Sequence, residues 1–167
     1  MPFDFYARLV FSILVAAVAV WDVRALRIPD KLNLAILGAF VVFAAFSGFS
    51  AEELVRHVAG GALLFALFFA FAMAGPLGGG DVKFAGAIGV WIGFGQGLWE
   101  FVFLAAIYHL GLVAAAFVMR SSPLSAVIPP IPLPWVEDLV RGDKPFLKAV
   151  VPFGVPLAAS ALVMIWA

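Results

Sequence analysis

The chain contains no cysteine, which excludes disulfides, thiolate metal sites and cysteine nucleophiles. Charged residues make up only 12% of it, and no basic stripe suggests nucleic-acid binding. His57 and His109 lie in different segments, so no two-histidine metal site is expected, and His109 is predicted to hydrogen-bond a neighbouring helix. By contrast, 65% of the residues are hydrophobic, against about half in soluble domains. The composition therefore indicates a membrane protein without cofactor or metal.

Six long uncharged runs separate the charged residues. They cover residues 9–21, 32–51, 58–80, 84–99, 101–119 and 149–167. A membrane-spanning helix needs about 20 mostly apolar residues, so these runs predict about six spans. The fourth run is rich in glycine and is expected to be short or tilted, and Pro152 and Pro156 are expected to kink the beginning of the last span. The prediction is an all-α integral membrane protein with one domain over residues 1–167.

Shorter signals mark where individual helices begin. Proline is favoured in the first turn of a helix, so the second span is predicted to begin at Pro29 or Asp30. Ser50 and Glu53 have the spacing of a capping box, which predicts a helix start just before the third span.

Basic residues are distributed unevenly between alternate loops. One set of loops holds eight of the ten, namely Arg24, Arg27, Lys31, Lys83, Arg120, Arg141, Lys144 and Lys148. The other set holds only Arg8 and Arg56. Because cytoplasmic loops are enriched in lysine and arginine, the first set is predicted to face the cytoplasm and both chain ends the opposite side. The first set includes a proline-rich loop over about 120–148. We expect Trp135 and Leu139 to dock this loop on the membrane surface. The membrane is expected to be the plasma (inner) membrane.

Residues 75–83, GPLGGGDVK, place one carboxylate directly after a glycine-rich turn. Asp81 opens the fourth predicted span, and an ionisable group at the mouth of an apolar helix indicates a functional site. Asp22 closes the first span. Since the second span leaves that membrane face and the third returns to it, both aspartates are predicted at the cytoplasmic face. Gly78 and Gly80 would let another backbone approach Asp81 closely.

Two neighbouring carboxylates tend to share one proton, which separates their apparent pKa values. The ionised member can then activate a water, while the protonated member polarises a carbonyl group. Other interpretations involve no chemistry. Asp22 could be a juxtamembrane charge and Asp81 a helix N-cap. Close helix packing would explain Gly86 and Gly89 better than the clustered glycines before Asp81.

In its motifs the chain resembles the type IV prepilin peptidases, which belong to the GxGD class of intramembrane aspartic proteases. The residues that carry the resemblance, which covers nearly the whole chain, are Asp22, Arg24, Pro29, Gly78, Gly80, Asp81, Lys83, Pro152 and Gly154. The resemblance implies that Asp22 and Asp81 are the catalytic pair. It also implies that the partner is a prepilin or pilin-like precursor, whose short basic leader is cut off at the cytoplasmic face. Arg24 and Lys83 each follow an aspartate by two residues and are expected to tune catalysis rather than perform it.

Two features depart from the usual pattern of that family. Asp30 stands where the family usually has asparagine, which places a third carboxylate near the pair. The larger members carry a cysteine-containing insertion and methylate the new N-terminus, whereas this chain has no cysteine and only a short loop over residues 24–31. It therefore resembles the small, peptidase-only branch that serves Flp-type (Tad) pili, and no N-methyltransferase activity is expected.

Two alternatives stay open. The archaeal preflagellin peptidases share the six-span layout. A non-enzymatic transporter or pilus-assembly subunit could use the two aspartates to relay protons or to pack helices. A transporter is expected to show internal repeats and sites near the middle of the membrane, and neither is found in the sequence.

Overall fold

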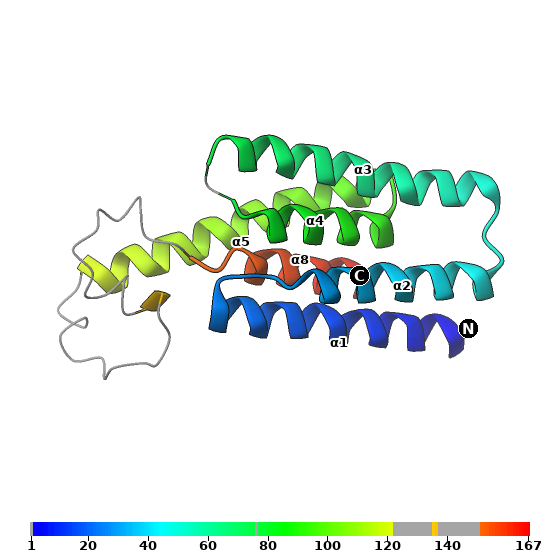
Figure 1. Cartoon of the computed structure of the whole chain (residues 1–167), viewed down its shortest axis with the longest axis horizontal. Helices are drawn as coiled ribbons and strands as arrows, with labels where there is room; N and C mark the ends of the chain where they lie inside the picture. The colour runs from blue at the N-terminus through cyan, green and yellow to red at the C-terminus, as the bar shows by residue number, and fades with distance from the viewer. Residues whose placement is uncertain (1, 76, 122–134, 137–150) are drawn as a thin grey trace.

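The computed structural model describes residues 2–75, 77–121, 135–136 and 151–167 (Figure 1). Within these residues the regular elements are helices, which confirms the predicted all-α class for this part of the chain. The helices are α1 (Pro2–Ala25), α2 (Asp30–Ser47), α3 (Ala51–Met73), α4 (Gly79–Ile92), α5 (Gln96–Ser121) and α8 (Gly154–Trp166). The predicted long loop over 120–148 lies mostly outside the described residues.

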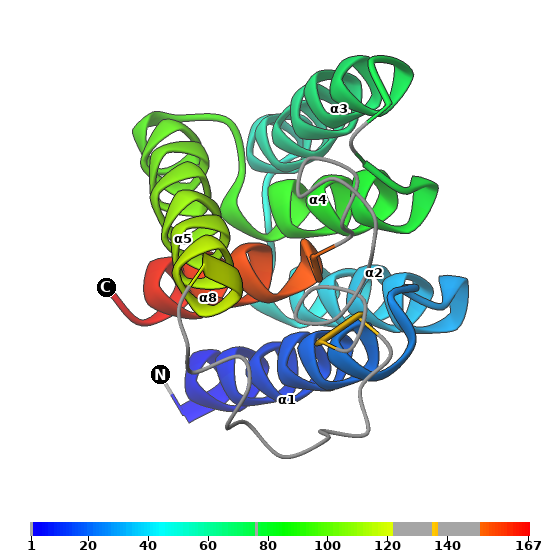
Figure 2. The same ribbon diagram turned by 90° about the vertical axis from the view of Figure 1, so that its left-hand side faces the viewer.

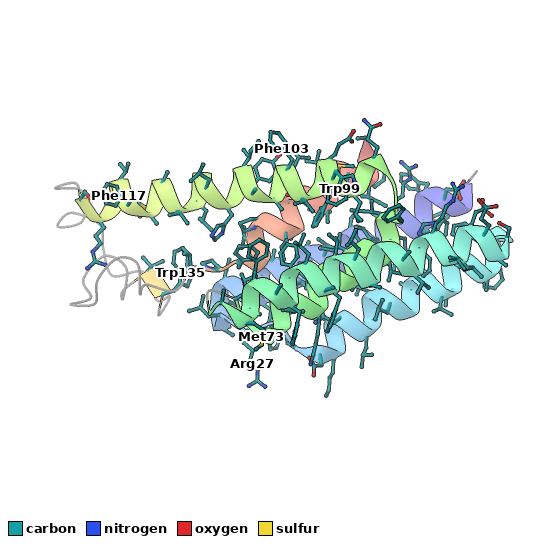
Figure 3. The ribbon with its side chains drawn as sticks, turned by 90° about the horizontal axis from the view of Figure 1, so that it is seen from above. Arg27, Met73, Trp99, Phe103, Phe117 and Trp135 are labelled. Atoms are coloured by element: carbon teal, nitrogen blue, oxygen red, sulfur yellow. The ribbon has the colours of Figure 1, made fainter. Side chains whose placement is uncertain are left out.

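Four helices, α1, α2, α3 and α5, are long and apolar enough to cross a membrane. Only 17% to 22% of the residues in their apolar windows are buried inside the bundle, so most of these side chains face outward. Phe103, for example, is 67% exposed and points away from the bundle (Figure 3). Extensive exposed apolar surface marks a contact with membrane or partner.

The other two helices are shorter than the predicted spans. α4 has 14 residues and α8 has 13, against the roughly 20 that a membrane crossing needs. The expectation of a short fourth segment is therefore confirmed. The total of six spans stays a prediction.

α4 and α8 lie in the middle of the bundle, with the four longer helices around them (Figure 2). α4 packs against α2, α3, α5 and α8, while α8 packs against α1, α4 and α5. Phe84 and Ile88 on α4 and Leu157 on α8 are fully buried. The central position of α4 fixes its first turn, which carries Asp81, relative to the other helices.

Glycines bring α3 and α4 into backbone contact. A Cβ atom added at Gly89 would lie 2.6 Å from the carbonyl oxygen of Gly60, and one at Gly86 would lie 3.2 Å from the Cβ of Phe65. Small residues permit this approach between membrane helices. The predicted close packing at Gly86 and Gly89 is thus confirmed. The contact between Gly89 and Gly60 had not been predicted.

Replacing Gly89 with valine should destabilise the protein by about 3 kcal/mol, because the new side chain meets the backbone of α3 rather than a movable side chain. Thermal unfolding of purified protein in detergent measures the effect. Gly38→Val on α2 is the matched control, since nothing lies within 4 Å of a Cβ atom there. Equal unfolding temperatures for the two variants would contradict the close contact.

The ends of three helices test the local predictions. The capping box is confirmed, because the Glu53 N–H donates to Ser50 Oγ at 3.2 Å and the Ser50 N–H donates to Glu53 Oε2 at 2.8 Å. α2 begins at Asp30, directly after Pro29, as predicted. The predicted kink in the last helix is wrong. α8 begins at Gly154, so Pro156 lies in its first turn, where the missing N–H group is tolerated.

The end of α1 and the beginnings of α2, α4 and α8 lie at one end of the bundle, on the left in Figure 1. The N-terminus lies at the opposite end, and α8 runs toward that end to reach the C-terminus. This arrangement brings the segments around Asp22 and Asp81 to the same end.

Candidate active site

A cavity of about 680 Å³ lies at this end of the bundle, between the α1–α2 connection and the start of α4. Its lining includes Asp22 from the end of α1, Asp30 from the start of α2 and Asp81 from the first turn of α4. The remaining lining residues are Trp21, Leu26, Arg27, Ile28, Pro29, Lys31, Gly78, Gly79, Gly80 and Lys83. The fold therefore brings two aspartates that are far apart in the sequence to the same cavity.

Asp22 is held by the beginning of the last helix. Its side chain is almost completely buried, at 3% exposure, and Oδ2 accepts a hydrogen bond from the backbone N–H of Gly154 at 2.7 Å. Gly154 is the first residue of α8. The leading N–H groups of a helix lack partners within it and favour a negative group nearby. The start of α8 therefore orients the Asp22 carboxylate.

This contact requires glycine at position 154. A Cβ atom there would lie 2.9 Å from Asp22 Oδ2 and 3.1 Å from Cδ1 of Ile28. Pro152, two residues earlier, is fully buried and restricts the backbone as it enters α8. The resemblance implicated Pro152 and Gly154 without giving either a role. The hydrogen bond to Asp22 supplies one for Gly154.

Asp81 is held by its own helix. It is the third residue of α4, and its Oδ2 accepts a hydrogen bond from the backbone N–H of Gly78 at 3.0 Å. Gly78 itself occupies the N-cap position, so the interpretation of Asp81 as an N-cap is wrong, although its side chain does bond the start of the helix. Both aspartates thus accept a hydrogen bond from a backbone N–H at a helix start.

Ile28 connects the two halves of the site. A Cβ atom on Gly80 would lie 3.1 Å from both the Cβ and the carbonyl oxygen of Ile28. Ile28 is 4% exposed and also contacts the position of Gly154. The chain reaches Ile28 through Leu26, whose φ of 49° is unusual for a residue other than glycine. The sequence assigns Ile28 no role in the site, because one isoleucine among so many apolar residues carries no chemical signal.

Lys83 forms its ion pair with Asp30, and the distance from Nζ to Oδ1 is 2.7 Å. Both side chains are at least half exposed, and the pair lies at the cavity. Any influence of Lys83 on Asp22 and Asp81 therefore acts partly through Asp30. Arg24 is exposed on α1 and does not line the cavity.

Trp135 reaches the site from the proline-rich segment. Its indole N–H donates to the carbonyl oxygen of Val23 at 2.8 Å, one residue after Asp22. Figure 3 shows Trp135 at this end of the bundle. The structure thus gives Trp135 a contact with α1, while docking of this segment on the membrane surface stays a prediction, and Leu139 lies outside the described residues.

The histidines lie outside this cavity. Nδ1 of His57 is 2.7 Å from the carbonyl oxygen of Val90 on α4. Nδ1 of His109 is buried and has no hydrogen-bond partner among the described residues, so the predicted bond to a neighbouring helix is not found there. The His109 ring instead packs against Phe153, with the ring centroids 4.3 Å apart. No group of metal-binding side chains occurs in the described part of the chain.

Comparison with known proteins agrees with this geometry. The family model described as the type IV leader peptidase family matches residues 9–119, which include both aspartates, the α1–α2 connection and all of α4. The chain belongs to the type IV leader peptidase family. This confirms the resemblance seen in the motifs and, with the four long apolar helices, supports a multi-pass membrane protein.

Among curated relatives of this family, the chain is similar to a prepilin leader peptidase/N-methyltransferase from Dickeya chrysanthemi. The two are 33% identical over 135 residues, which cover 78% of this chain and 46% of the relative. The chain thus spans about half the length of the curated relative it matches. No solved structure matches the chain.

Proposed function

We propose that the chain is an aspartic endopeptidase that removes the basic leader from type IV prepilin or pilin-like precursors. The observation that carries this proposal is that Asp22 and Asp81 line one cavity. Each is held there by a hydrogen bond from a backbone N–H. Membership of the type IV leader peptidase family supports the choice of substrate.

In the proposed reaction, the two carboxylates share one proton. The ionised carboxylate removes a proton from a water molecule, whose oxygen attacks the carbonyl carbon of the scissile peptide. The protonated carboxylate gives its proton to the carbonyl oxygen. When the tetrahedral intermediate collapses, the carbon–nitrogen bond breaks, and the carboxyl group that took the proton from water gives it to the amide nitrogen. The other carboxylate takes a proton back from a hydroxyl group of the intermediate, which restores the singly protonated pair. These steps require no metal or cofactor.

The precursor has to present an extended peptide to this pair. Gly78 lies in the wall beside Asp81 and carries no side chain that would block a backbone. Gly80 lies in the same wall, where its missing side chain leaves room for Ile28. The 680 Å³ volume is within the range of about 300–1,000 Å³ of small-molecule sites, so it can hold a few residues around the cut.

The site is proposed to face the cytoplasm from a plasma (inner) membrane, with the chain ends on the other side. Arg27, Lys31 and Lys83 line the cavity, whereas Arg8 and Arg56 lie near the starts of α1 and α3, toward the other end of the bundle. Cytoplasmic faces are enriched in such basic residues.

A topology assay tests this orientation. A reporter fused after Ala167 or inserted after Gly48 should report the non-cytoplasmic side, because both positions are predicted to lie opposite the basic cavity. A reporter within residues 123–134 should report the cytoplasm. The assay compares an alkaline phosphatase fusion, active only outside the cytoplasm, with a fluorescent reporter at the same positions. A cytoplasmic C-terminus would contradict the orientation.

We further propose that the enzyme belongs to the small branch serving Flp-type (Tad) pili and transfers no methyl group. The connection between α1 and α2 comprises only residues 26–29, which leaves no cysteine-containing insertion at that place. The alternative that the enzyme cleaves preflagellins, like the archaeal preflagellin peptidases, is decided by the substrate test below. The transporter alternative has less support, because both aspartates line a cavity at one end of the bundle.

The test of the function is processing by purified protein in detergent. Precursors of Flp-type pilins should be shortened by one cut at the end of the leader, as mass spectrometry of both products would show. A preflagellin and a precursor with its leader glycine replaced are the comparison substrates. No cleavage of any precursor by stably folded protein would contradict the proposal. A labelled methyl donor in the same reaction should leave the new N-terminus unlabelled.

Asp30→Asn should keep processing within about twofold of the unmodified enzyme, because an exposed ion pair contributes only about 0–1 kcal/mol. Lys83→Met should lower processing, but by less than about tenfold. The measurement is kcat/KM for one precursor. A complete loss in either variant, in protein that still folds, would assign that residue a direct part in the chemistry.

A further inference from the structure

The last turn of α1, residues 22–25, carries Asp22. Its carbonyl groups need partners from outside the helix, because the last four carbonyls of a helix have none within it. The carbonyl oxygen of Asp22 accepts from the N–H of Leu26 at 2.8 Å, and the chain then leaves the helix, since Leu26 has a φ of 49°. Among the described residues, the carbonyl oxygen of Val23 accepts only from the indole N–H of Trp135, at 2.8 Å. Trp135 therefore caps the C-terminal end of α1.

This capping contact is partly shielded from water. The hydrogen bond between Trp135 and Val23 is partly buried, and the neighbouring Val136 is only 7% exposed. A shielded hydrogen bond is electrostatically stronger than one in water. Trp135 does not line the cavity that holds the aspartates. It therefore acts on α1 rather than on a molecule bound in the cavity.

Two residues from the C-terminal part of the chain thus hold Asp22. Gly154, 132 residues away, donates to its side chain. Trp135, 112 residues from Val23, donates to the turn of backbone that carries this side chain. A hydrogen bond to a side chain fixes the position of its carboxylate only where the backbone beneath it is fixed as well.

We propose that Trp135 is a positioning residue for Asp22, and that its hydrogen bond to Val23 holds the last turn of α1 in the geometry that the reaction needs. This inference rests on the proposed function. Helix ends fray when their carbonyl groups lack partners. A displacement of about 1 Å at a catalytic group can lower the rate by about a hundredfold, so a frayed last turn would slow the chemical step.

Two substitutions at this position separate the hydrogen bond from the packing of the ring. In histidine, Nε2 occupies the place in the five-membered ring that Nε1 occupies in tryptophan, and it can carry a proton. Phenylalanine has a ring of similar size without a donor. Trp135→His and Trp135→Phe both remove the outer half of the indole, so a difference between them reports the hydrogen bond.

Trp135→Phe should lower kcat by about three- to tenfold, which corresponds to the loss of one hydrogen bond, whereas Trp135→His should stay within about twofold of the unmodified enzyme. KM should not change in either variant, because Trp135 lies outside the cavity. Trp166→Phe is the matched control and should retain kcat. Its indole N–H also donates to α1, to Ser12 Oγ at 3.0 Å, but toward the other end of the bundle.

Equal kcat values for Trp135→Phe and Trp135→His would overturn the proposal. So would a rise in KM without a fall in kcat. An unfolding temperature that falls in Trp135→Phe but not in Trp135→His would assign the bond a purely structural role, which also overturns it.

Hydrogen exchange gives a readout that does not depend on cleavage. The amide of Leu26, which bonds the carbonyl oxygen of Asp22, should exchange faster in Trp135→Phe than in Trp135→His or Trp166→Phe. Mass spectrometry of a peptide that covers residues 22–28 measures this. Unchanged exchange in Trp135→Phe would contradict the cap. The proposed function fails in a different way, since the unmodified enzyme would then cleave no precursor while the exchange difference remained.

Discussion

Replacing Asp22 with asparagine should lower precursor processing by at least about a thousandfold, and Asp81→Asn should do the same. Asparagine keeps the size of the side chain but can neither act as the base nor hold the shared proton. Groups that act as one unit are strongly non-additive, so the double variant should be scarcely worse than either single one. The measurement is single-turnover cleavage of one precursor at saturating enzyme.

Glu100→Gln is a suitable control for these variants. It also removes one carboxylate charge, but Glu100 lies near the start of α5, where its Oε1 accepts from Gln96 Nε2 at 2.8 Å, outside the cavity. It should retain full activity. Unequal effects of the two aspartates, or losses that multiply in the double variant, would indicate that they act separately.

Gly154→Ala should lower kcat by about ten- to a hundredfold while leaving the unfolding temperature nearly unchanged. The added Cβ atom would lie 2.9 Å from Asp22 Oδ2, so the carboxylate has to move. A side-chain end can rotate away at little cost to the fold, but a displacement of about 1 Å at a catalytic group can cost about a hundredfold in rate.

The matched control for this variant is Gly111→Ala on α5, because nothing lies within 4 Å of a Cβ atom there. Both variants are compared by kcat and by thermal unfolding in detergent. Full activity in Gly154→Ala would show that the contact between α8 and Asp22 is not needed for the reaction. A large fall in its unfolding temperature would instead indicate a structural role.

The two aspartates could be predicted from the sequence because their signal is local. A single charge beside a glycine cluster in an apolar chain stands out, and counting membrane crossings puts Asp22 and Asp81 on one face. The contacts that hold them could not be predicted in this way. Gly154 and Asp22 are 132 residues apart, and only the packing of α8 against α1 brings them together.

Helix lengths could not be read accurately from the uncharged runs. Glycine and proline carry no charge, so the uncharged runs included residues outside the helices, such as 77–78 and 93–95, and therefore exceeded the helices. α4 ends at Ile92, next to Gly93, whose φ of 79° an L-residue rarely adopts. The packing of two short helices at the centre depends on glycines of α3 and α4 that meet only in the folded chain.

The pH dependence of kcat/KM for the purified enzyme, in the presence of a metal chelator, tests the central claim most directly. If one aspartate has to be ionised and the other protonated, the profile is bell-shaped, and the chelator does not change it. A rate that rises or falls in only one direction across about pH 4 to 9, or activity that the chelator removes and a divalent metal restores, would contradict the account.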